Sequence, residues 1–115
     1  MAAFSLFSRR KNDNIKSLKP SEFRKFITEN SIQLVDVRTL EEFEQQKIEG
    51  AQLIDIYNPN FESILDAKLD VLIPVCVYCH TGMRSMSAAK ILAKKGFTVY
   101  NLKGGMLFWK QTPLI

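Results

Sequence analysis

Apolar and polar residues follow two patterns along the chain, short apolar-rich runs and amphipathic stretches at helical spacing. The short runs predict buried strands at residues 33–37, 51–56, 74–78 and 98–102, and a short edge strand over Ile15–Leu18. The amphipathic stretches predict helices at residues 20–29, 40–46, 61–69, 85–95 and 105–110. Strands that alternate with helices form a parallel sheet with helices on both faces, so the pattern predicts an α/β domain.

Turn-forming and capping residues support these boundaries. Pro20 suits the first turn of a helix, and Gly96 stands where a helix C-terminal glycine belongs. The turn-forming cluster Asn12-Asp13-Asn14 precedes the first predicted strand. The sequence therefore predicts a flexible N-terminal tail over residues 1–14 and a single domain over residues 15–115.

The strand at 74–78 and the helix at 85–95 enclose the loop Cys79-His80-Thr81-Gly82-Met83-Arg84-Ser85. Parallel sheets bind their ligands at the carboxyl ends of the strands, and Cys79 lies at such an end in this prediction. Loop N–H groups and the positive end of the following helix favour the thiolate over the thiol. Arg84 adds a fixed positive charge, and Gly82 lets the loop curl without a Cβ clash. The stretch therefore predicts a cup for one sulfur atom and its bound anion.

This loop resembles the C-x-x-G-x-R-S active-site loop of the rhodanese family of sulfurtransferases. Two further stretches resemble the other family signatures in the right order: Leu34-Val35-Asp36-Val37-Arg38 with Glu41-Glu42-Phe43, and Leu102-Lys103-Gly104-Gly105 with Trp109. Where the family usually has Gly-His-Ile, this chain has Gln46-Lys47-Ile48. The resemblance spans about residues 16 to 111. It implies a three-layer α/β/α fold around a central, mainly parallel five-stranded sheet.

The resemblance also implies thiosulfate:cyanide-type sulfur transfer through a persulfide on Cys79. The Cys79 thiolate would attack the outer sulfur of thiosulfate, sulfite would leave, and a thiol, a sulfur-carrier protein or cyanide would accept the sulfur. Inward-pointing N–H groups would stabilise the anionic persulfide, and Arg84 would hold charge on the donor and the leaving group. This chemistry needs no metal or organic cofactor.

The other loop residues have weaker functional interpretations. His80, the only histidine of the chain, either contacts an acceptor and tunes the thiol or simply faces solvent. Thr81 and Met83 are expected to shape the rim of the loop. Ser85 is expected to cap the following helix, and it can also donate a hydrogen bond toward sulfur.

Asp36 and Arg38 are candidates for a supporting role, because their strand is expected to end beside the Cys79 loop. The alternative, which we favour, is a structural ion pair that joins Arg38 to Glu42, or Asp36 to a group of the loop. Gly104 and Gly105 are expected to form a backbone turn next to the loop.

Cys76 and Cys79 form a C-x-x-C pair, which also occurs in dithiol redox sites. Cys76 falls inside the predicted strand, and three strand steps separate the two Cα atoms by roughly 10 Å. A disulfide needs a Cα separation below about 7 Å. We therefore expect Cys76 to fill the core rather than to pair with Cys79.

Two other functions remain as alternatives to sulfur transfer. A cysteine phosphatase or arsenate reductase would use a C-x5-R loop, whereas Cys79 to Arg84 is a tighter C-x4-R loop that suits sulfur better than phosphate. A rhodanese-like module without turnover would serve binding or regulation, since fold does not fix function. The presence of both Cys79 and Arg84 favours the enzyme, because a non-catalytic module is expected to have lost the thiol.

Composition and charge narrow the choice of partners and location. The chain has 115 residues, two cysteines and a net charge of +4, of which Arg9, Arg10 and Lys11 supply three charges in the predicted tail. The remaining 13 basic residues nearly balance the 12 acidic ones, which argues against a nucleic-acid partner. No apolar run could span a membrane, and the N-terminal charges follow the apolar residues, the wrong order for a secretory signal. We therefore expect a cytoplasmic monomer without a disulfide framework.

Overall fold

The computed structural model describes residues 14–109, in which five strands and five helices alternate. The strands are β1 (Ile15–Leu18), β2 (Gln33–Asp36), β3 (Gln52–Leu53), β4 (Val75–Tyr78) and β5 (Val99–Leu102). The helices are α1 (Pro20–Glu29), α2 (Leu40–Gln45), α3 (Phe61–Lys68), α4 (Met83–Lys94) and α5 (Gly105–Trp109). The alternation of strands and helices matches the pattern that the sequence predicts.

Within the described residues the strands form one sheet in the order β1-β5-β4-β2-β3, and each neighbouring pair is parallel. The predicted mainly parallel, five-stranded sheet is therefore confirmed. β4 lies at the centre, hydrogen-bonded to β5 on one side and to β2 on the other. All four of its residues are fully buried, which explains why its sequence is a continuous apolar run.

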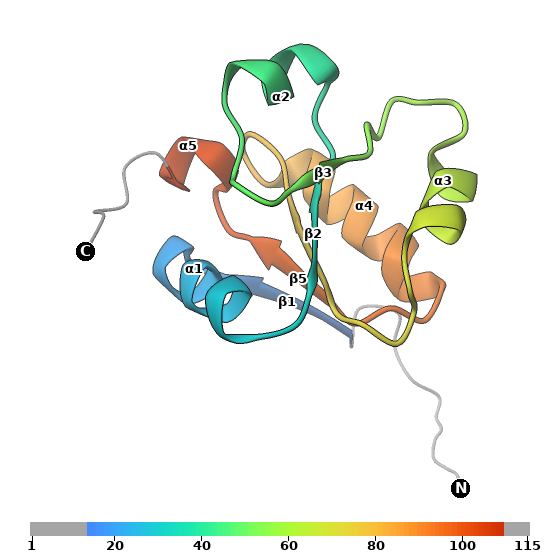
Figure 1. Ribbon diagram of the computed structural model, residues 1–115, viewed down its shortest axis with the longest axis horizontal. Helices are drawn as coiled ribbons and strands as arrows, with labels where there is room; N and C mark the ends of the chain where they lie inside the picture. The colour runs from blue at the N-terminus through green and yellow to red at the C-terminus, as the bar shows by residue number, and fades with distance from the viewer. Residues whose placement is uncertain (1–13, 110–115) are drawn as a thin grey trace, which may run out of the picture.

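Helices cover both faces of the sheet and give the predicted three layers (Figure 1). α3 and α4 lie on one face, where Leu65 and Leu92 pack in one core cluster with the odd-numbered strand residues. α1 and α5 lie on the other face, where Phe23 and Met106 pack with Tyr78 in a second cluster. α2 follows the carboxyl end of β2, at the top of the view in Figure 1.

Two elements differ from the prediction by more than one residue at an end. The strand predicted at 51–56 contracts to Gln52–Leu53. The Ile54 and Ile56 N–H groups still donate to the Asp36 and Val37 carbonyls, and the Asp55 side chain then accepts the Tyr57 N–H in a turn. The helix predicted at 85–95 begins earlier, at Met83, because Gly82 adopts a left-handed conformation with φ of 103° directly before it. Both differences arise from local turns beside the carboxyl ends of the strands.

The first strand lies at the edge of the sheet, close to the start of the described residues. β1 pairs in parallel with β5 at one border of the sheet, which confirms the predicted edge strand. The predicted tail, residues 1–14, lies outside the described residues apart from Asn14. Between residues 14 and 109 no helix has the length and apolar character that a membrane crossing requires.

Candidate functional site

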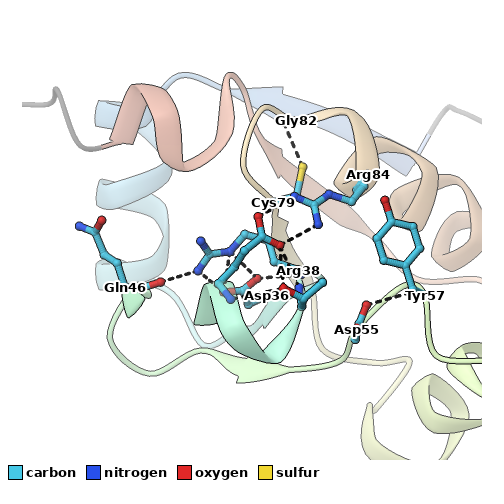
Figure 2. A network of polar contacts seen from close by, with 10 residues as sticks. Asp36, Arg38, Gln46, Asp55, Tyr57, Cys79, Gly82 and Arg84 are labelled. Carbon is cyan, nitrogen blue, oxygen red and sulfur yellow. Dashed lines mark hydrogen bonds and ion pairs between the residues drawn. The ribbon is translucent and has the colours of Figure 1, made fainter. Parts of the chain in front are cut away.

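Cys79 directly follows β4, at the carboxyl end of the central strand. Val75, Val77 and Cys79 belong to the same core cluster, so the thiol lies on the face that α4 covers. The residue is fully buried, and the Gly82 N–H donates a hydrogen bond to Sγ over 3.0 Å (Figure 2). The sulfur is therefore held inside its own loop, with a backbone donor directed at it.

The same loop starts helix α4. The first helical hydrogen bond runs from the Met86 N–H to the Gly82 carbonyl. The N–H groups of Met83, Arg84 and Ser85 therefore have no acceptor within the helix, as at every helix N-terminus. This end of the twelve-residue helix carries partial positive charge beside Cys79, as the sequence predicts.

Ser85 does not cap α4, so that prediction is wrong. Gly82 is the N-cap residue, and Ser85 is the third residue of the helix. Ser85 is fully buried, and its Oγ has no hydrogen-bond partner within the described residues. The early start of the helix at the left-handed glycine moves this hydroxyl from the cap position into the first turn.

A second turn supports the loop from the opposite side. The N–H groups of Met106 and Leu107, in the first turn of α5, donate to the Cys79 and His80 carbonyls over 2.9 and 3.0 Å. Gly104 and Gly105 precede them with φ values of 80° and 61° and allow the backbones to approach closely. The predicted glycine turn beside the loop is therefore confirmed.

Arg84 is bound by a carboxylate rather than left free. Its two terminal guanidinium nitrogens donate to the two Glu42 carboxylate oxygens, each over 2.9 Å (Figure 2). The Thr39 N–H and hydroxyl also donate to Glu42 Oε1, in the capping box at the start of α2. The ion pair thus ties α2 to the first turn of α4 across the opening of the Cys79 loop.

The ion pair changes the acidity of both groups. The hydrogen bond from Arg84 lowers the pKa of Glu42 to about 2. The hydrogen bond to Glu42 is also the main cause that raises the pKa of Arg84, and the charge of Cys79 contributes in the same direction. Glu42 is therefore ionised and Arg84 charged near neutral pH.

Glu42→Gln is expected to remove a source of acid sensitivity. Because the pKa of Glu42 is depressed from 4.5 to about 2, its contribution is complete above pH 4.5 and is lost as the pH falls toward 2. About a third of the side chain is exposed, so after solvent screening we expect about 1 kcal/mol. Urea unfolding at pH 6 and pH 2.5 measures it: the wild type should be more stable at pH 6 and should lose most of that advantage at pH 2.5.

Glu41→Gln is the matched control, because Glu41 is exposed and lies in the same first turn of α2. It removes the same charge without touching Arg84, so its pH dependence should follow the wild type. Equal pH dependence of Glu42→Gln and the wild type would show that the ion pair does not contribute to stability.

Asp36 and Arg38 form a buried ion pair with each other, not the pairs expected with Glu42 or with the loop. Arg38 Nη2 lies 2.7 Å from Asp36 Oδ2, Nε contacts both carboxylate oxygens, and the side chains are 5% and 0% exposed. Arg38 also donates to the Gln46 carbonyl (Figure 2). Burial of the guanidinium works against its charge, but Asp36 outweighs it and raises the pKa of Arg38. The pair holds the turn after β2 together, which favours the structural interpretation.

The remaining loop residues lie around the opening. His80 is half-buried and lines a cavity of about 390 Å³ together with Arg38 and Glu42. Thr81 is exposed, and Met83 is 77% exposed. The structure thus brings His80 and Arg38 to one cavity on the α2 side of the loop and places Met83 on its outer rim.

Cys76 fills the core, as predicted. It belongs to the cluster on the α1 and α5 face, whereas Cys79 belongs to the cluster on the opposite face, and both thiols are free. Burial raises the pKa of Cys76 to about 12, so this thiol stays protonated and inert. Within the described residues, no three His, Cys, Asp or Glu side chains are grouped so that they could hold a metal ion.

Comparison with known proteins assigns this geometry to a family. The model of the rhodanese-like domain matches residues 19–112. A thiosulfate sulfurtransferase GlpE of Pseudomonas aeruginosa is 34% identical, over 87% of this chain and 88% of its own. The uncharacterized protein YqhL of Bacillus subtilis is 38% identical, over 83% of this chain and 72% of its own length. A crystal structure of a rhodanese-like domain protein from Staphylococcus aureus superposes with a TM-score of 0.72 at 29% identity, over 82% and 90% of the two chains. The chain therefore belongs to the rhodanese-like domain family.

Proposed function

We propose that the protein is a thiosulfate sulfurtransferase that carries sulfane sulfur as a persulfide on Cys79 and acts as a cytoplasmic monomer. The observation that supports this most directly is the position of Sγ, which accepts the Gly82 N–H at the N-terminus of α4. A backbone donor and the positive end of a helix stabilise a thiolate and then an anionic persulfide. The similarity to thiosulfate sulfurtransferases that cover nearly the whole chain supports the same donor.

The reaction takes place in two displacements. The Cys79 thiolate attacks the outer sulfur of thiosulfate, the sulfur–sulfur bond of the donor breaks, and sulfite leaves with the electron pair. An acceptor thiolate or cyanide then attacks the outer sulfur of the persulfide, and Cys79 leaves as a thiolate. Neither step needs an external oxidant or reductant, because the sulfane sulfur carries its oxidation state with it.

The ion pair between Arg84 and Glu42 determines how a sulfur donor binds beside Cys79. Both terminal nitrogens of Arg84 are occupied by Glu42, and the Glu42 carboxylate repels a second anion. A thiosulfate dianion gains the Arg84 contact only by sharing or displacing Glu42. We therefore propose that Arg84 orients the donor after this ion pair has loosened.

A binding module without turnover is the second candidate, and one observation favours it. Cys79 is 0% exposed, so a donor reaches Sγ only if the loop or the ion pair moves. A module that only docks to a partner needs no such movement. Turnover measurements distinguish the two candidates directly.

The decisive test compares two assays on one protein. We expect thiosulfate and cyanide to yield sulfite and thiocyanate, and we expect no release of nitrophenol from p-nitrophenyl phosphate. The six residues from Cys79 to Arg84 enclose one sulfur, whereas a phosphate needs donors at roughly 2.7–3.2 Å from three equatorial oxygens. Phosphate release that depends on Cys79 would replace this proposal with the phosphatase alternative, and silence in both assays would favour the binding module.

A glycine inserted after Gly82 is expected to weaken sulfur transfer, because the longer C-x5-R loop no longer closes on one sulfur. We expect a loss of about 100-fold in kcat/KM for thiosulfate, comparable to the loss of a preorganised anion donor. A glycine inserted after Gly50 is the control, because this exposed turn has no heavy atom within 4 Å of an added Cβ. Equal activity of the two insertion variants would show that loop length does not determine the chemistry.

A further inference from the structure

A groove of about 490 Å³ lies on the far side of the Cys79 loop from the cavity that His80 lines. It is formed where β1 and β5 end, along the first turns of α4, and its lining includes Thr81 and Gly82 of the loop. Parallel sheets bind ligands at the carboxyl ends of their strands, and this groove is at that end. Nothing in the sulfur-donor chemistry described above uses it.

Asn101 of β5 indicates that a ligand binds in this groove. The residue lines the groove and is 3% exposed, and its Oδ1 has no hydrogen-bond partner within the described residues. A buried amide oxygen without a donor costs free energy, so such groups in native proteins need an explanation. A ligand that donates an N–H group to Oδ1 supplies the missing partner.

The groove is close to the reacting sulfur. Asn101 pairs with Val77 in the sheet, and Val77 and Cys79 share one face of β4. Strand spacing and rise therefore place the Cα atoms of Asn101 and Cys79 roughly 8 Å apart. Gly82 lines the groove and also donates its N–H to Sγ. A molecule in the groove is thus separated from Cys79 by little more than the loop backbone.

The charge of the groove selects an anionic ligand. Lys90 of α4 and Lys103 after β5 are exposed and line it, and neither takes part in an ion pair within residues 14–109. No acidic side chain is among the lining residues. Ser17, the partner of Asn101 in the β1–β5 register, adds a hydroxyl at the border of the sheet. A carboxylate near the lysines and an N–H near Asn101 match these groups.

We propose that this groove binds the sulfur acceptor, a small thiol that carries a carboxylate and an amide or amine N–H. The proposal rests on the proposed function and names the acceptor class for the same site. The carboxylate contacts Lys90 and Lys103, the N–H donates to Asn101, and the acceptor thiolate reaches over Gly82 to the persulfide. A new sulfur–sulfur bond forms to the acceptor, the bond between Cys79 Sγ and the outer sulfur breaks, and Cys79 leaves as a thiolate.

The test isolates the second half-reaction. The protein is loaded with thiosulfate and freed of excess donor. It is then mixed with N-acetylcysteine, N-acetylcysteamine, 3-mercaptopropionate or cyanide. Loss of sulfur from the protein is followed at equal concentrations of the reacting thiolate or cyanide anion. N-acetylcysteine carries both recognition groups, N-acetylcysteamine lacks the carboxylate, 3-mercaptopropionate lacks the N–H, and cyanide lacks both. We expect N-acetylcysteine to react about tenfold faster than either thiol that lacks one group.

Two variants test the contacts in the groove, and a third is the control. In Lys90→Gln/Lys103→Gln the ratio of the N-acetylcysteine rate constant to the cyanide rate constant should fall about tenfold. In Asn101→Leu this ratio should fall about fivefold while Tm rises by about 4 °C, because an unpaired buried oxygen is removed. Lys94→Gln, the control, removes a charge from the exposed end of α4 outside the groove and should keep the ratio.

Unchanged ratios in both groove variants, Lys90→Gln/Lys103→Gln and Asn101→Leu, with the persulfide intact, would overturn the acceptor site. So would N-acetylcysteine and N-acetylcysteamine reacting equally fast with the wild type. A direct titration with S-methyl-N-acetylcysteine, followed by NMR shifts of the Gly82 and Lys103 amides, measures the groove without turnover. A protein that binds this probe but forms no persulfide would contradict the proposed function, whereas a persulfide without binding would contradict only the groove.

Discussion

Replacing Cys79 with serine is expected to abolish sulfur uptake from thiosulfate. The wild type should gain one sulfur, about 32 Da, because the loop stabilises first the thiolate and then the persulfide. Serine keeps the shape of the residue but is not ionised near neutral pH and cannot hold sulfane sulfur. Mass spectrometry of the intact, thiosulfate-treated protein, followed by peptide mapping, measures the gain and its position.

Cys76→Ser is the matched control, because Cys76 lies in β4, three residues before Cys79, and is equally buried. Its pKa of about 12 keeps the thiol protonated, and its side chain faces the other core cluster. The variant should gain sulfur as the wild type does, although the buried hydroxyl will lower its stability. Sulfur mapped to Cys76 in the wild type would assign the reaction to the other face of the sheet.

Gly105→Ala is expected to cost about 3 kcal/mol of folding free energy, or about 12 °C in Tm, and to displace the active loop. A Cβ at this position would lie 2.4 Å from the His80 carbonyl oxygen and 2.6 Å from the Cys79 carbonyl oxygen. Both contacts are with backbone, which cannot rotate away as a side chain does. The same two carbonyls accept the N–H groups of α5, so relief of the clash breaks these bonds and moves Cys79.

Gly104→Ala provides the comparison, because Gly104 also has a positive φ, of 80°. There the three atoms nearest to an added Cβ all belong to the Phe108 ring, at 2.3–2.9 Å, so the contact is with a half-exposed side chain and not with backbone. We expect a loss of about 1 kcal/mol, mainly from the left-handed backbone, and sulfur-transfer activity close to that of the wild type. Thermal unfolding and thiosulfate:cyanide kinetics of both variants measure the difference, and equal losses would mean that the backbone contact at Gly105 is not special.

The fold and the position of Cys79 were predictable because they depend on local patterns. The uninterrupted apolar run of β4 marks the central strand, since only a strand covered on both faces is buried at every residue. A cysteine at its carboxyl end, followed by glycine and then a helical pattern, places the thiol at a helix N-terminus. Pro20 and Gly96 fixed helix ends in the same way, through their own backbone preferences.

The partners of the charged side chains were not predictable from the sequence. Glu42 and Arg84 are 42 residues apart, and only the packing of α2 over the loop joins them. Glu42, which the sequence offered as a partner of Arg38, binds Arg84 instead. Asn101 carries only a weak signal in the sequence, since it is a polar residue on the buried face of an otherwise apolar strand. Such a position indicates function only once the missing hydrogen bond is known.

The hydrogen bonds from α5 to the loop bear on the order in which the protein assembles. Cys79 is synthesised well before Met106 and Leu107, and β5, which borders β4, also follows it in the chain. A nascent chain thus contains Cys79 before it contains the segment whose N–H groups hydrogen-bond to the carbonyl groups of its loop. Until β5 and the first turn of α5 have been synthesised, this thiol has neither its neighbouring strand nor its supporting turn, so we expect it to be open to oxidants and to chaperones. Protection of Cys79 is completed only when α5, which follows it in the chain, has folded against its loop.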